Sequence, residues 1–129
     1  MKNNFQLTYP EKSSNQMITI LVKVINVIFI CFVYNSHKIL QNIVDQDLSA
    51  EDFPFSSSKL MKANGRLIRV FRISFVGELG YELHIPLESC ERVYKGIMEF
   101  GKPWDLKLAG YRALYSLSCE KGILNKNSM

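Results

Sequence analysis

The amino-acid sequence predicts an α+β fold, in which an antiparallel sheet is flanked by helices. Residues 71–75 and 81–85 alternate apolar with polar side chains, which is the period-2 pattern of half-buried strands. Over residues 88–100, apolar residues recur at intervals of three and four, as they do on one face of a helix. A short turn joins the two strands, so they run antiparallel, and helices both precede and follow them.

The composition describes an ordinary globular chain. Its 129 residues allow one domain with its own core, and 47% are hydrophobic and 22% charged. The net charge of +4 is spread along the chain, so no basic stripe for nucleic acid is expected, although the mild positive field would suit an anionic ligand. The three cysteines are widely spaced and form no CxxC pair, which argues against a disulfide framework or a structural zinc site and favours a reducing compartment.

The N-terminal third differs in kind from the rest. Residues 1–16 are polar, whereas Met17 to Tyr34 is almost wholly apolar, apart from Lys23 and Asn26. This length is near the lower limit for crossing a bilayer, and a central lysine would cost about 2.5–3.5 kcal/mol there. Three interpretations stay open: a marginal membrane anchor, a buried strand or helix, or sequence foreign to the domain. We favour the third, with residues 17–34 as a peripheral helix.

From Ser36 the pattern becomes regular. Ser36 is expected to cap a helix, and Ser49 begins a single turn that stops at Phe53-Pro54. After a polar turn at 56–58, Asn64-Gly65 ends a short helical stretch and opens the long first strand. The side chains expected in the core of this part are Ile39, Leu40, Ile43, Val44, Phe53 and Phe55.

Two glycines bracket the turn between the strands. Gly77 and Gly80 allow backbone angles that are costly for other residues, so Glu78 is expected at a hairpin tip. Rigid scaffolds often present ligand-binding groups at such places. His84 alternates to the polar face of the second strand and is expected to be solvated or hydrogen-bonded.

The two C-terminal helices are delimited by glycines. Cys90 lies on the apolar face of the helix at 88–100, so it is expected to pack in the core. Gly101 ends this helix and Pro103 prevents its continuation. The last helix is expected from about 109 to 121.

Three segments carry a family resemblance. RISFVGELGYELHIP (72–86), DLSAEDFPFSSSKL (47–60) and AGYRALYSLSCEKG (109–122) resemble the folate-binding domain of the glycine-cleavage T-protein type, in the family's order. Within that superfamily they most resemble the sarcosine dehydrogenase and dimethylglycine dehydrogenase family. The resemblance implies a partial T-protein-like folate-binding domain at 37–122, preceded by an unmatched segment, 1–36, and followed by a tail, 123–129.

The resemblance also implies site residues. Glu78 matches the glutamate that binds folate, and its two oxygens suit the adjacent N–H donors of a pterin ring. Arg112 matches an arginine that contacts folate, and Tyr81 could stack on a flat ring. The alternatives are a solvated turn acid for Glu78, a surface arginine or a Glu120 partner for Arg112, and core filling for Tyr81. Tyr115 departs from the family, which usually has aspartate there.

By the same resemblance, the chain is a fragment of a mitochondrial flavoenzyme. Such an enzyme oxidises an N-methyl amine with FAD and passes the one-carbon unit to tetrahydrofolate in the matrix. No GxGxxG fingerprint, catalytic residue or metal cluster is found in the sequence, so the isolated chain is expected to lack sarcosine oxidation activity. The alternatives are a fragment of an aminomethyltransferase and a non-catalytic module tethered to a membrane through 17–34.

Overall fold

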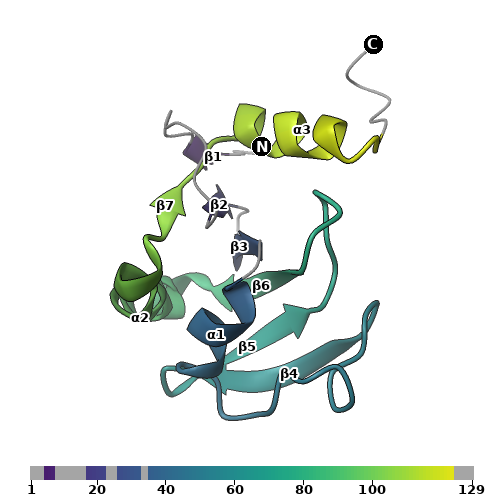
Figure 1. Cartoon of the computed structure of the whole chain (residues 1–129). Helices are drawn as coiled ribbons and strands as arrows, with labels where there is room; N and C mark the ends of the chain where they lie inside the picture. Colours follow the sequence, from purple (N-terminus) through teal and green to yellow (C-terminus); the bar gives the residue numbers. More distant parts are fainter. Residues whose placement is uncertain (1–4, 8–16, 23–25, 33–34, 124–129) are drawn as a thin grey trace.

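The structure is a computed structural model that describes residues 5–7, 17–22, 26–32 and 35–123 (Figure 1). It confirms the α+β class, with an antiparallel sheet and flanking helices. Two single 3-10 turns, Leu87–Ser89 and Lys102–Trp104, flank the longest helix. In chain order the elements are β1 (Phe5–Leu7), β2 (Met17–Val22), β3 (Asn26–Phe32), α1 (Ser36–Gln41), β4 (Ser58–Ala63), β5 (Arg66–Phe71), β6 (Gly80–Pro86), α2 (Cys90–Gly101), β7 (Lys107–Leu108) and α3 (Tyr111–Glu120).

The sheet has the strand order β1-β2-β3-β6-β5-β4, and β7 pairs in parallel with β2. β4 and β5 form a hairpin whose two turn residues, Asn64 and Gly65, both have positive φ (49° and 79°). That is the backbone of a type I′ turn, for which Asn-Gly is the favoured pair. The short helical stretch predicted before Asn64 is therefore wrong, because residues 58–63 form a strand of this hairpin.

The described parts of the N-terminal apolar stretch, residues 17–22 and 26–32, lie inside the sheet, and residues 23–25 and 33–34 of the predicted element lie outside the described residues. Residues 17–34 were expected to form a peripheral helix, but the structure contains two strands there, β2 and β3. β3 pairs with β2 on one side and with β6 along its whole length on the other, from Asn26↔Pro86 to Phe32↔Gly80. The physical reason is that β6 would otherwise expose a full edge of unpaired backbone groups, and a stretch rich in Ile and Val suits a strand. Among the described helices, none combines the length and hydrophobicity that crossing a bilayer requires.

One face of the β4–β5–β6 sheet carries the core. Helices α1 and α2 pack on this face, and Figure 1 shows α2 to one side of the sheet with α3 across its top. Ile39, Leu40, Ile43 and Phe53 are buried as predicted. The remaining buried hydrophobic residues of this cluster are Leu48, Met61, Ala63, Ile68, Val70, Tyr81, Leu83, Ile85, Val93, Ile97 and Leu106, with Val44 packed against them.

Phe55 is a correction to the predicted core, because 70% of its surface is exposed. The chain reverses direction here: the N–H of Ser57 donates to the carbonyl of Pro54 (3.3 Å), and Ser56 has a φ of 66°. This turn directs Phe55 outward although it stands only two residues after the buried Phe53. The predicted polar turn at 56–58 is thus a reversal whose last residue begins β4.

The opposite face of the sheet is more polar. Leu60 and Leu67 are exposed on it, and the ring of His84 lies beside that of Phe71, with 4.8 Å between centroids. Nε2 of His84 lies 2.5 Å from Oε1 of Glu82, which stands two residues earlier on the same strand. The prediction of a hydrogen-bonded histidine on the polar face is confirmed.

The free edge of β4 is covered by residues 43–46. The N–H of Asp45 donates to the carbonyl of Lys62 (3.0 Å), and the carboxylate of Asp45 accepts from the N–H of Lys62 (2.8 Å). The side-chain amide of Gln46 donates to the carbonyl of Leu60 (2.9 Å). Backbone groups that face away from β5 are therefore satisfied by a neighbouring segment of the same chain.

Helix α2 agrees with its prediction to within two residues at each end. The helix ends at Gly101, as predicted. A side chain does not fit at this position, because a Cβ at 101 would stand 2.6 Å from Cβ of Leu106. Cys90 is partly buried and packs against the core, as expected. Burial, and secondarily the neighbouring Glu91 carboxylate, raise the pKa of the Cys90 thiol.

A consequence is that the cysteines should differ in reactivity. Cys119 is exposed on α3, whereas Cys90 is partly buried. The raised pKa of Cys90 also lowers the fraction of its thiol that is present as the reactive thiolate near pH 8. Iodoacetamide at pH 8, followed by peptide mass spectrometry, should alkylate Cys119 about tenfold faster than Cys90. Faster modification of Cys90 in the folded chain would contradict its placement against the core.

Candidate functional site

The connection between β5 and β6 is a loop of residues 72–79 rather than the predicted tight turn. The strand predicted at 71–75 ends at Phe71, and of the two bracketing glycines only Gly77 has a positive φ (73°). Gly80 is already the first residue of β6. Glu78 therefore lies in a longer loop that leaves the sheet, rather than within a two-residue hairpin turn.

Arg72, the first residue after β5, anchors the loop to the segment before β4. Its N–H donates to the carbonyl of Ser57 (2.9 Å), and its carbonyl accepts from the N–H of Ser56 (2.8 Å). Its guanidinium donates to the carbonyl of Phe53 (2.6 Å). These three bonds tie the first residue of the 72–79 loop to the reversal at 53–57.

The loop is docked against α3. The hydroxyl of Ser118 donates to the carbonyl of Phe75 (2.6 Å), and Nζ of Lys121 lies 2.5 Å from Oε1 of Glu78. Val76 is fully buried between these contacts. On the α1 side, the hydroxyl of Ser36 donates weakly to the carbonyl of Leu79 (3.5 Å). Ser36 is thus the first residue of α1, after Asn35 at the N-cap, and it ties the loop to the helix instead of capping it.

Three aromatic rings line the contact between the loop and α3. Phe75 meets Tyr115 edge to face, with 6.3 Å between centroids, and Tyr115 lies 4.9 Å from Tyr111. Burial first, and then the neighbouring Tyr115, raise the pKa of the Tyr111 hydroxyl above its usual value. The Tyr111 hydroxyl is therefore neutral near pH 7, and its ring packs against that of Tyr115. Tyr115, at the position where the resemblance implied an aspartate, packs its ring against Phe75 of the loop.

Glu78 is accessible to a ligand. Its side chain is 44% exposed, and the ion pair with Lys121 involves only Oε1. Within residues 35–123, no hydrogen bond or ion pair engages Oε2. A carboxylate has about four acceptor positions, so Glu78 can accept two parallel N–H donors from a planar ligand while it keeps its lysine partner.

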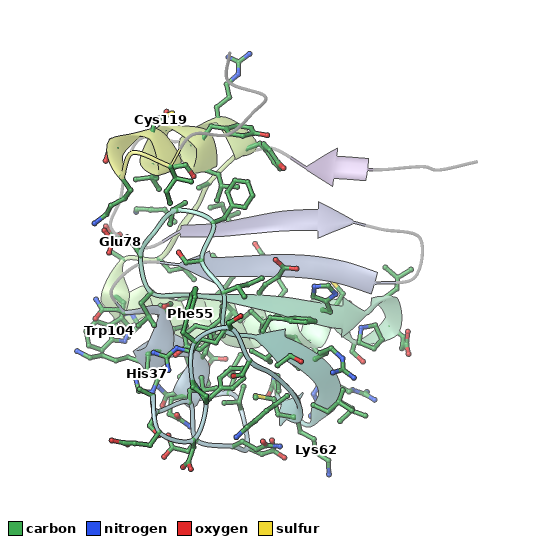
Figure 2. All side chains as sticks on the ribbon, turned by 90° about the vertical axis from the view of Figure 1, so that its right-hand side faces the viewer. His37, Phe55, Lys62, Glu78, Trp104 and Cys119 are labelled. Atoms are coloured by element: carbon green, nitrogen blue, oxygen red, sulfur yellow. The ribbon has the colours of Figure 1, made fainter. Side chains whose placement is uncertain are left out.

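Arg112 does not converge on Glu78. It is exposed in the first turn of α3, whereas Glu78 meets Lys121 at the other end, roughly 13 Å along the helix axis. Arg112 and Cys119 are seven residues apart and so share a face of α3, and Figure 2 shows Cys119 on the side away from Glu78. The two residues that the resemblance assigns to one folate site therefore do not meet in this arrangement. No ion pair joins Arg112 to Glu120 or to any other described residue.

Tyr81 lies in the core. It is 1% exposed, its ring stacks on that of Phe53 (6.2 Å between centroids, 19° between planes), and its hydroxyl donates to the carbonyl of Leu48 (3.4 Å). The structure favours core filling over stacking on a ligand. Tyr81 instead anchors the end of the loop, because it stands at the start of β6.

Lys121 is the site residue that the sequence reasoning missed. Its only signal was a cation at the end of a helix, a common position that suits the helix dipole. Its pairing with Glu78 depends on how α3 docks. Among the described residues there is no group of three or more His, Cys, Asp or Glu side chains that could hold a metal ion.

Comparisons with known proteins agree on the C-terminal three quarters of the chain. A family model described as the GCVT N-terminal domain matches residues 35–128. Human mitochondrial sarcosine dehydrogenase is 58% identical over 87 residues, which are 67% of this chain and 10% of that protein. Human mitochondrial dimethylglycine dehydrogenase is 34% identical over 86 residues, again 67% and 10%. An aminomethyltransferase of Caldanaerobacter subterraneus is 35% identical over 88 residues, 68% of this chain and 23% of that protein. The chain spans about a tenth of the length of the two dehydrogenases.

Proposed function

The chain belongs to the GCVT N-terminal domain family, and from this premise we propose that it supplies part of the tetrahydrofolate site of a mitochondrial, sarcosine-dehydrogenase-like flavoenzyme. The identity to a sarcosine dehydrogenase (58%) is higher than that to an aminomethyltransferase (35%), which supports the dehydrogenase. The related dehydrogenases are named mitochondrial, which supports the proposed compartment. Oxidation of the N-methyl amine would use FAD, bound by a part of the longer protein that these residues do not supply.

Glu78 carries the proposal. Its half-exposed carboxylate keeps Oε2 available and stands on a loop that α3 and α1 hold in place. A pterin presents two adjacent N–H donors, which match the two oxygens of a carboxylate in a charge-assisted pair. Tetrahydrofolate, when bound, supplies the nitrogen atoms that take up the one-carbon unit. The residues of this chain would bind and orient it.

Replacing Glu78 by glutamine tests the proposal. The side chain keeps its size but loses its charge, and one acceptor becomes a donor that faces the donors of the pterin. A hydrogen bond to a charged group contributes about 1.5–3 kcal/mol, so the affinity for 5-formyltetrahydrofolate should fall by about 10- to 100-fold. Isothermal titration calorimetry on the full chain measures the change.

Glu91→Gln is the matched control for this experiment. Glu91 is also an exposed carboxylate paired with a lysine, Lys95 (2.6 Å), but on α2. Its replacement should leave the dissociation constant unchanged. Arg112→Gln should have a smaller effect than Glu78→Gln, because Arg112 lies on a different face of α3. A wild-type chain that binds no reduced folate, or equal affinities for wild type and Glu78→Gln, would overturn the proposal.

An aminomethyltransferase is the second candidate, because one such enzyme is 35% identical over 68% of this chain. Both candidates would use Glu78 in the same way, so folate binding cannot separate them. The reading frame upstream in the gene separates them: an FAD-binding segment there supports the dehydrogenase, and a frame without one supports the transferase.

A further inference from the structure

We propose that Lys121 is a positioning residue for Glu78, which it holds in the orientation that receives the pterin edge. This inference rests on the proposed function and adds a second residue to the same site. Lys121 follows the last turn of α3, and its ammonium lies 2.5 Å from Oε1 of Glu78. The lysine acts through the carboxylate and has no contact of its own with the ligand.

The backbone of Lys121 is fixed. The N–H of Gly122 donates to the carbonyl of Cys119 (2.9 Å), and that of Ile123 donates to the carbonyl of Ser118 (3.0 Å). Gly122 has a φ of 71°, which makes this a left-handed helix cap of the kind that glycine favours. Lys121 is thus held at a rigid helix end.

The loop is fitted to the same helix end. A Cβ placed on Gly77 would lie 3.3 Å from Cβ and Cγ of Lys121, so the lysine stem packs directly against the glycine that precedes Glu78. The hydroxyl of Ser118 binds the carbonyl of Phe75 on the same side (2.6 Å). These contacts bring the loop backbone to Lys121, and the ion pair then fixes the side chain of Glu78.

A cation at the C-terminal end of α3 is electrostatically favourable. The C-terminus of a helix carries a partial negative charge, which repels a carboxylate beside it. The ammonium of Lys121 offsets this repulsion and gives Glu78 a reason to point toward the helix end. Because the lysine occupies one of about four acceptor positions on the carboxylate, it orients Glu78 without blocking it.

The test is the affinity of three variants for 5-formyltetrahydrofolate, measured by calorimetry on the full chain. Lys121→Met should weaken binding about fivefold, because an unheld carboxylate must be ordered when the ligand binds. Lys121→Arg should restore affinity to within about twofold, since it keeps the charge at the helix end. Lys95→Met is the matched control and should change nothing, because Lys95 pairs with Glu91 on α2. At about 1 M salt, where exposed ion pairs are screened, the fivefold difference should shrink.

A second ligand separates positioning from direct contact. 6-Methyltetrahydropterin lacks the glutamate tail of a folate, and Lys121→Met should weaken its binding by the same factor. A loss confined to 5-formyltetrahydrofolate would mean that Lys121 binds the tail, which overturns the inference. Unchanged or tighter binding by Lys121→Met would overturn it as well. If Glu78→Gln has no effect in the same assay, the proposed function fails instead, whatever the lysine variants do.

Discussion

Phe53→Ala is expected to destabilise the fold by about 3–5 kcal/mol, the usual cost of removing a buried aromatic side chain. Phe53 is fully buried, and its ring stacks on that of Tyr81. The ammonium of Lys59 also lies 5.8 Å from its ring centroid. Truncation therefore leaves a cavity beside Tyr81, the second residue of β6, and also disturbs the end of the 72–79 loop.

Phe55→Ala is the matched control, two residues away and with the same change of side chain. Phe55 is 70% exposed, so the free energy of unfolding should change by no more than about 0.5 kcal/mol. Urea unfolding followed by circular dichroism gives both values, compared at an unchanged m-value. Equal destabilisation by the two variants would show that the reversal at 53–57 does not place these rings as the structure has them.

Ile30→Pro is expected to lower stability by about 2–3 kcal/mol. Residue 30 lies in β3, which has β2 on one side and β6 on the other. Its N–H therefore faces a paired strand whichever of the two sides it points to. Proline removes this donor and is excluded from central strands for that reason. The carbonyl that loses its partner contributes about 1–3 kcal/mol of the cost, and the clash of the ring adds to it.

Ile30→Val keeps the backbone donor and a β-branched side chain, so it serves as the control for the proline variant. Thermal unfolding should place Ile30→Val near the wild type and Ile30→Pro well below it. If the proline variant unfolds at the wild-type temperature, residues 26–32 do not form a central strand.

Helices and strands whose apolar residues recur with a regular period could be predicted from the sequence. Helix α2 carries an unbroken apolar stripe, and β6 alternates strictly, so local pattern sufficed for both. The stretch at 17–34 has no period because it is apolar almost throughout, and such a run cannot be assigned to strand or helix by pattern. Its place was decided by the unpaired edge of β6, which is a tertiary requirement.

In the candidate site, too, local sequence pattern predicted one part and tertiary packing decided the rest. The glycines and the family resemblance were enough to single out Glu78, and the structure leaves its carboxylate accessible. The position of Arg112 and the pairing of Lys121 depend on how α3 is rotated against the loop, which no local pattern encodes. Tyr81 alternates to the apolar face, as predicted, and its burial by Phe53 decides between the two roles that the sequence allowed.

The cover over the free edge of β4 has a consequence for self-association. Asp45 and Gln46 occupy the backbone groups that a strand of another molecule would need for pairing. Intermolecular strand addition at this edge, the first step of cross-β polymerisation there, must therefore wait until residues 43–46 detach. Since this segment directly follows α1, we expect fibril nucleation at β4 to depend on transient opening of α1 rather than on the protein concentration alone.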